Sequence, residues 1–193
     1  MRFADEFTEF AEAAAPRLRR TAFLLCGDWH TDAMQSVEFS PNGKLLLTID
    51  SELSARLWSV ASRRQVGKPI GGRSRGSVNS AVFSPNGKLV ATAGPANFKM
   101  WSVATQNRVG KNVQAGRFSA SGVGFTSDSK ILVTTDADGT IRQWSVATSK
   151  QILPVIAPKD HPSFSVEAVS PAAQLLATTQ VDGNARLWVL TKA

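Results

Sequence analysis

The sequence predicts a mainly β fold in which one structural unit is repeated four times, preceded by a short helical segment. The first observation is four tryptophans whose successive spacings are 43, 43 and 44 residues: Trp58, Trp101, Trp144 and Trp188. The second is a hydrophobic landmark whose spacings are 44, 42 and 44 residues: Phe39, Phe83, Phe125 and Val169. Two landmarks that repeat together indicate tandem copies of a single supersecondary unit.

Each unit begins with a short apolar stretch, predicted as a strand and followed by a turn. In the first two units the turn is Ser-Pro-Asn-Gly-Lys, where proline fixes φ and Asn-Gly accepts positive φ. The third and fourth units keep shorter turns at 127–130 and 170–173. The predicted first strands are 36–39, 81–83, 122–125 and 166–169.

A second apolar run follows, and another turn then leads into the tryptophan strand. That turn contains Asp-Gly in units three and four. Four short strands in each period of about 43 residues, bounded by turn signals, are typical of β-propeller blades. The predicted second strands are 45–49, 89–93, 131–135 and 175–179, and candidate fourth strands are 65–70, 108–113 and 151–156.

The segments SVEFSPNGKLLLT, AVFSPNGKLVATA, DADGTIRQW and DGNARLW resemble the WD-repeat family over about residues 29–193. The resemblance implies a four-bladed or partial WD-repeat β-propeller with blades at about 29–70, 71–113, 114–156 and 157–193. In that family a His, a Ser/Thr, an Asp and the Trp form a hydrogen-bonded set in each blade. The matching positions here are His30, Thr48, Trp58, Thr92, Trp101, Thr134, Asp138, Trp144, Thr178, Asp182 and Trp188. No unit has the full set, and unit one has Glu52 where Asp is usual.

Residues 1–28 are expected to form a separate helical segment. Phe3, Phe7 and Phe10 lie at helical spacing, and Leu18, Ala22 and Leu25 do so again. The string FTEFAEAAAPRLRRTAFLLCGDWH resembles the first helices of bacterial extracytoplasmic-function sigma factors, which implies contact with RNA polymerase. Counting the repeat backwards instead places 21–26 in an outer-strand slot, where they would close a ring against residues 185–189. The spacing favours a helix, and both assignments stay open.

Composition restricts the class of protein. With 42% hydrophobic and 19% charged residues, the chain is expected to be globular and not disordered. No apolar run reaches the roughly 18 residues of a membrane helix. The opening MRFADEF lacks the basic start of a secretory signal, so a cytoplasmic location is expected.

The sequence shows no pattern that predicts an enzyme. One cysteine, Cys26, and two histidines exclude a disulfide framework and a closed Cys/His zinc site, so no metal is expected. Gly71, Gly72 and Gly76 lack the strand-to-helix context of a phosphate-binding loop. No nucleophile-elbow sequence occurs. We therefore expect neither catalysis nor a cofactor.

The leading functional prediction is a bacterial, non-catalytic scaffold for protein–protein interaction, as the WD-repeat resemblance implies. The net charge of +7 favours an acidic partner. The loops before the first strands supply a basic rim with aromatic points, namely Arg73, Arg75, Arg117, Phe118, Lys159 and His161.

Other functions remain as alternatives. The main one is a transcription-related protein that docks on RNA polymerase through residues 1–28. Nucleic-acid binding ranks below it because no aromatic–basic stacking platform is present. Self-association stays open, because four units are at the lower limit for propellers and uncovered blade faces promote association. The last alternative is a degenerate fusion without a retained role.

Overall fold

The structure, a computed structural model, describes residues 36–71, 77–95, 97–114, 120–136 and 140–152, and the strands 164–169, 175–180 and 185–189. The regular secondary structure within these ranges is β-strand, so the prediction of a mainly β fold is confirmed. The predicted helical segment 1–28 lies outside the described residues, and so does the choice between helix and strand at 21–26.

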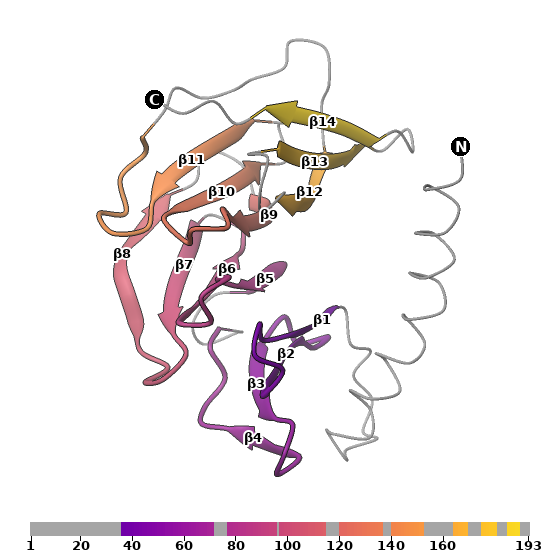
Figure 1. The fold of residues 1–193 in the computed structure, drawn as a ribbon, viewed down its shortest axis with the longest axis vertical. Helices are drawn as coiled ribbons and strands as arrows, with labels where there is room; N and C mark the ends of the chain where they lie inside the picture. The colour runs from indigo at the N-terminus through magenta and orange to yellow at the C-terminus, as the bar shows by residue number, and fades with distance from the viewer. Residues whose placement is uncertain are drawn as a thin grey trace.

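The strands form four antiparallel sheets, here called blades 1 to 4 (Figure 1). Blade 1 contains β1 (Ser36–Phe39), β2 (Leu45–Ile49), β3 (Ala55–Ser59) and β4 (Arg64–Val66). Blade 2 contains β5 (Ser80–Phe83), β6 (Leu89–Ala93), β7 (Asn97–Ser102) and β8 (Arg108–Gln114). Blade 3 contains β9 (Ala120–Phe125), β10 (Ile131–Asp136) and β11 (Ile141–Ser145). Blade 4 contains β12 (Phe164–Val169), β13 (Leu175–Gln180) and β14 (Ala185–Val189).

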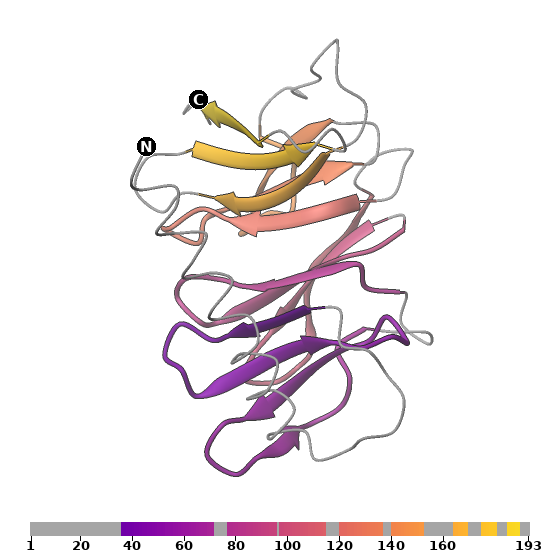
Figure 2. The ribbon, with the colours of Figure 1, turned by 90° about the vertical axis from the view of Figure 1, so that its right-hand side faces the viewer.

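The blades follow one another in chain order and touch mainly through their first two strands. β1 and β2 contact β5, β5 and β6 contact β9, and β9 and β10 contact β12. Blade 1 and blade 4 stand at opposite ends of this row in two perpendicular views (Figures 1 and 2). The described strands therefore form an open arc, which is the partial form of the predicted propeller.

The pairing register is the same in all four blades. The tryptophan lies opposite an apolar residue of the second strand, in the pairs Leu46–Trp58, Val90–Trp101, Leu132–Trp144 and Leu176–Trp188. Two residues away, a threonine lies opposite a basic residue, in the pairs Thr48–Arg56, Thr92–Lys99, Thr134–Arg142 and Thr178–Arg186. The repeat of about 43 residues in the sequence is thus a repeat of the same sheet.

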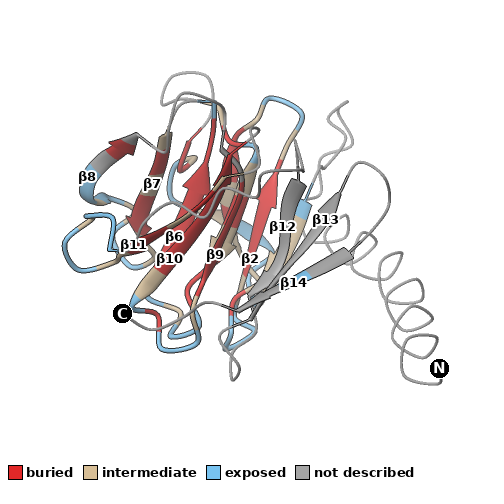
Figure 3. Cartoon of the chain, turned by 90° about the horizontal axis from the view of Figure 1, so that it is seen from above, coloured by how far each residue is buried: buried red, intermediate tan, exposed pale blue. Residues whose placement is uncertain are grey.

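The hydrophobic core lies between blades, and Figure 3 shows buried residues along β6, β9 and β10. At the junction of blades 1 and 2, Leu47 and Leu57 pack with Phe83 and Trp101. At the next junction, Phe98 lies 5.0 Å from Trp144 between ring centroids, in a tilted arrangement that favours aromatic pairs. Trp101 and Trp144 thus pack on the preceding blade. We call this side of a blade its indole face and the opposite side its trailing face.

The turn after the first strand has the same hydrogen bonds in blades 1 and 2. The Ser40 hydroxyl donates to Asn42 Oδ1 at 2.8 Å and accepts from the backbone N–H of Leu45 at 2.9 Å. Ser84, Asn86 and Leu89 repeat this arrangement. In blade 3, Thr126 and Asp128 replace the Ser and the Asn. Gly43 and Gly87 have φ values of 67° and 69°, as the Asn-Gly sequence predicts.

The outer strand of blade 1 is shorter than predicted. The sequence predicts a strand over 65–70, whereas β4 ends at Val66, because Gly67 turns the chain with a φ of 65°. The side chain of Gln106, from blade 2, donates to the Val66 carbonyl at 2.6 Å and accepts from the Lys68 N–H at 3.0 Å. A contact between blades therefore replaces the continued ladder. In blade 3 the predicted strand 151–156 is described only as far as Ile152, and Gln151 forms a bridge with Trp144.

Candidate interaction surface

The tryptophan and threonine positions come together in three blades. The indole N–H donates to a threonine Oγ1 at 2.9 Å in each of the pairs Trp58–Thr48, Trp101–Thr92 and Trp144–Thr134. Trp101 and Trp144 are buried, with 5% and 6% of their surface exposed. A buried indole needs one acceptor, and the threonine supplies it inside the sheet. These residues stabilise the blades and leave no polar group for a ligand.

Several predicted residues lie outside the described residues. His30, Asp138 and Asp182 are among them, and the whole basic rim is as well: Arg73, Arg75, Arg117, Phe118, Lys159 and His161. For Thr178 and Trp188 the structure gives the strand register and no side-chain contact.

The described ends of two rim loops lie on one end of the blades, here called the long-loop face, which carries the turns 50–54, 94–97 and 136–140. The loop 72–76 starts near Ile70, whose backbone N–H donates to the Ala55 carbonyl at 2.8 Å. It ends near Val78, whose backbone N–H donates to the Leu53 carbonyl at 2.9 Å. The loop 115–119 starts at Gln114, paired with Asn97, and ends at Ala120, paired with Asp136. Both loops therefore emerge beside blade 2.

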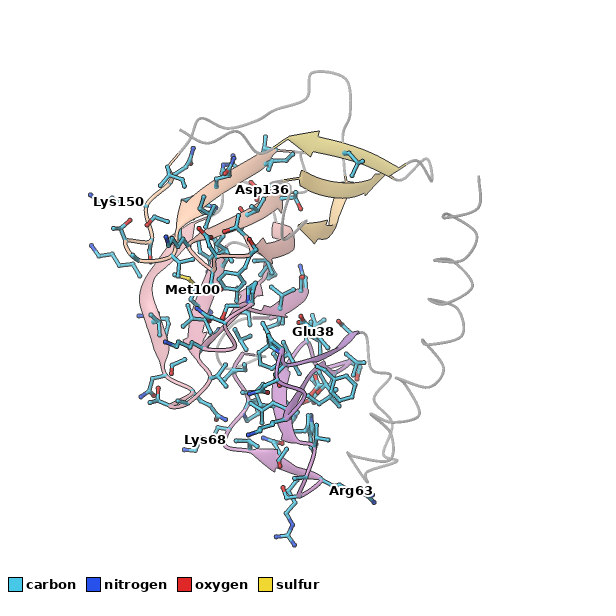
Figure 4. The ribbon with its side chains drawn as sticks, viewed as in Figure 1. Glu38, Arg63, Lys68, Met100, Asp136 and Lys150 are labelled. Carbon is cyan, nitrogen blue, oxygen red and sulfur yellow. The ribbon has the colours of Figure 1, made fainter. Side chains whose placement is uncertain are left out.

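Near this face, two blades carry an ion pair that the sequence reasoning missed. Arg56 Nε lies 2.8 Å from Asp50 Oδ2 in blade 1, and Arg142 pairs with Asp136 in blade 3. The Asp136 side chain is fully buried (Figure 4). The recurring signal was an aspartate six residues before the arginine in units one and three.

Blade 2 differs at the same position, because Gly94 follows β6 where Asp50 follows β2 and Asp136 ends β10. A Cβ atom at Gly94 would overlap the backbone carbonyl of Ser77, so a carboxylate does not fit there without displacing that segment. The basic residue of this blade is Lys99. Burial, and then the positive charge of Arg108 on β8, lower the pKa of Lys99. The Asp–Arg pair of blades 1 and 3 is therefore not repeated at this position of blade 2.

A second charged residue that the sequence reasoning missed lies between blades 1 and 2. Glu38 on β1 accepts a hydrogen bond from the backbone N–H of Phe83 on β5 at 3.0 Å (Figure 4). Burial raises the pKa of Glu38 to about 7, and this hydrogen bond opposes the shift. No pattern in the sequence distinguished this glutamate from a solvent-facing residue of an edge strand.

Two further searches concern only the part of the chain that the structure describes. Within it, no group of three or more His, Cys, Asp or Glu side chains is placed to hold a metal ion. The same residues contain no helix with the length and apolar character needed to cross a membrane.

Two of the repeated segments match a known family model. The family model "WD domain, G-beta repeat" matches residues 67–102 and 114–145, which cover most of blade 2 and blade 3. The two matched segments include the Thr92–Trp101 and Thr134–Trp144 pairs, so each of them contains the repeated indole hydrogen bond. A comparison with curated proteins gave no match.

Two solved structures share this fold, and one of them is a structure of WD40 repeats. A crystal structure of RRP9 WD40 repeats superposes with a TM-score of 0.73 at 20% identity, covering 84% of this chain and 50% of that one. A structure of U3-55K superposes with a TM-score of 0.66 at 16% identity, covering 86% of this chain and 54% of that one. The chain thus spans about half the length of these structures. The comparisons give no support to the sigma-factor resemblance of residues 1–28.

Proposed function

We propose that this protein is a non-catalytic scaffold that binds an acidic protein segment on its long-loop face. WD repeats generally form surfaces for protein interaction, and the fold here is that of a WD-repeat propeller. The observation that carries the proposal is that the described ends of the two loops that hold Arg73, Arg75 and Arg117 lie beside blade 2 on this face.

The loops next to blade 2 contain basic residues. Arg73 and Arg75 belong to the loop before β5, and Arg117 belongs to the loop after β8. The described ends of both loops lie beside the long-loop face. Complementary charge steers partners and fixes their register more than it adds affinity. An acidic segment laid across blade 2 would lie between the two loops.

The test uses a fluorescent glutamate-rich peptide as a probe of acidic chains. Reversing the loop charges in the triple variant R73E/R75E/R117E is expected to reduce affinity by roughly 10- to 100-fold at low salt. The matched control is K44E/K88E/K130E, which changes the net charge equally. Lys44, Lys88 and Lys130 are exposed in the turns at the other end of the blades.

The two triple variants separate a defined surface from general charge. Retained binding in the lysine triple, with loss in the arginine triple, supports the long-loop face. Equal loss in both would show that the probe senses only net charge and would overturn the proposal. Unchanged binding in the arginine triple would remove these loops from the site.

A further inference from the structure

The arc ends in two sheet faces of the kind that form its internal junctions. One position on the trailing face recurs in all four blades, where a residue of the tryptophan strand pairs with the second strand in the same register. The pairs are Leu57–Leu47, Met100–Ala91, Gln143–Val133 and Leu187–Ala177. The first residue of each of the first three pairs is buried, with 1%, 2% and 2% exposed, whereas Leu187 is 72% exposed. The trailing face of blade 4 is therefore uncovered at this leucine.

The blade at the other end of the arc, blade 1, also has accessible apolar side chains. On the indole faces of blades 2 and 3, the landmark phenylalanines Phe83 and Phe125 are buried, as are their tryptophans. In blade 1 the equivalent Phe39 and Trp58 are only partly buried, and so is Val37, which packs with them on Leu46. The indole face of blade 1 thus retains accessible apolar surface.

These two faces are the two halves of one further junction. The junctions of blades 1 with 2 and 2 with 3 join the trailing face of one blade to the indole face of the next. Blade 1 and blade 4 cannot supply such a junction to each other, because they stand at opposite ends of the arc (Figures 1 and 2). An uncovered apolar face of this kind marks an interaction site.

We propose that the occupant of these faces is a second copy of this chain. Blade 1 of each copy packs on blade 4 of the other, so that four blades from each copy close one ring with two-fold symmetry. The observation that favours a second copy is that both halves of the junction are present on one chain, the indole face of blade 1 and the trailing face of blade 4. The proposal does not depend on the long-loop face, so the two proposals can fail separately.

The test measures the mass of the full chain in solution by light scattering, over a range of concentrations. The native chain is expected to have twice the mass of one copy. Leu187→Glu is expected to weaken association by roughly 100-fold or more, because the new carboxylate would be buried without a partner. Since Leu187 is largely exposed, this change leaves the fold of a single copy intact. Lys88→Glu, in an exposed turn, is the matched control and keeps the native mass.

A mixing experiment tests the head-to-tail arrangement. Val37→Glu blocks the indole face of blade 1, and circular dichroism verifies that the variant is folded. Each variant alone is expected to be a single copy, whereas their mixture regains paired copies, because one junction in the mixed pair keeps two native faces. A native chain that stays single at every concentration overturns the proposal. Pairing that survives Leu187→Glu, or a mixture that does not recover, also overturns it.

Discussion

The Glu38 carboxylate on β1 accepts a hydrogen bond from the backbone N–H of Phe83 on β5 at 3.0 Å, and so ties blade 1 to blade 2. The contact joins the first strands of two neighbouring sheets, where the N–H of an edge strand would otherwise lack a partner. Its cost is the partial burial of a charge, which raises the pKa of Glu38 to about 7. The strength of this junction therefore depends on pH.

Replacing Glu38 with glutamine should reduce the pH dependence of stability. The folded chain keeps the Glu38 proton up to about pH 7, whereas an ordinary glutamate in the unfolded chain has a pKa of 4.5. The stabilisation that comes from protonated Glu38 is therefore complete below pH 4.5, and it is lost as the pH rises through 7. At pH 8 we expect Glu38→Gln to be more stable than the native chain by about 2 kcal/mol. Urea unfolding at pH 5 and pH 8 measures this difference.

The control for that experiment is Glu52→Gln, because Glu52 is exposed in the turn between β2 and β3. Its unfolding midpoint should follow the native pH profile. A Glu38→Gln variant with the same profile as the native chain would show that the Glu38 carboxylate is not the source of the dependence.

Removing the threonine acceptor should cost more in blade 2 than in blade 1. Thr92→Val leaves the buried Trp101 indole N–H without a partner, at a cost of about 1–3 kcal/mol. Thr48→Val makes the same change beside Trp58, which is only partly buried, so that water can replace the hydroxyl. We expect a cost there of about 1 kcal/mol or less. Guanidinium unfolding measures both variants, and equal costs would contradict this explanation.

The two ion pairs should differ in the same way. Asp136→Asn removes a carboxylate that is fully buried against Arg142, and we expect a loss of about 2–4 kcal/mol in unfolding free energy. Asp50→Asn affects the more exposed Arg56 pair, with an expected loss of about 1 kcal/mol. Thermal unfolding at low and high salt compares them. A salt-sensitive loss in Asp136→Asn would indicate that the pair is solvated.

Alanine at Gly67 should disturb the contact between blades, whereas alanine at Gly43 should not. Both glycines have positive φ, so each substitution strains the backbone by about 1 kcal/mol. At Gly43 no atom lies within 4 Å of the added methyl group. At Gly67 the methyl group would overlap the Gln106 amide and displace its two hydrogen bonds, which adds about 1–2 kcal/mol. Similar unfolding free energies for the two variants would refute the role of Gln106.

Local patterns in the sequence predicted the repeated parts of the sheets well. The strands at 36–39, 45–49 and 89–93 have the observed bounds, because each is a short apolar run ended by a turn sequence with a defined backbone preference. The outer strand at 65–70 was predicted too long. Its end depends on the Gln106 side chain of the next blade, and a contact over that separation leaves no local pattern.

The charged groups of the candidate surface were harder to predict for a related reason. The partner of Arg142 is Asp136, across a turn, and the partner of Glu38 is the Phe83 N–H in another blade. Burial defines both interactions, and burial follows from how the blades stack. The rim residues Arg73, Arg75 and Arg117 remain predictions, since they lie outside the described residues.

The recurring junction between indole and trailing faces also bears on how such a chain can change in length. Because successive junctions join the same two kinds of surface, a duplicated segment of about 43 residues would find matching neighbours wherever it was inserted. Duplication or loss of whole units would then alter the reach of the arc without requiring new contacts. Propellers of different sizes could arise in this way from one ancestral blade.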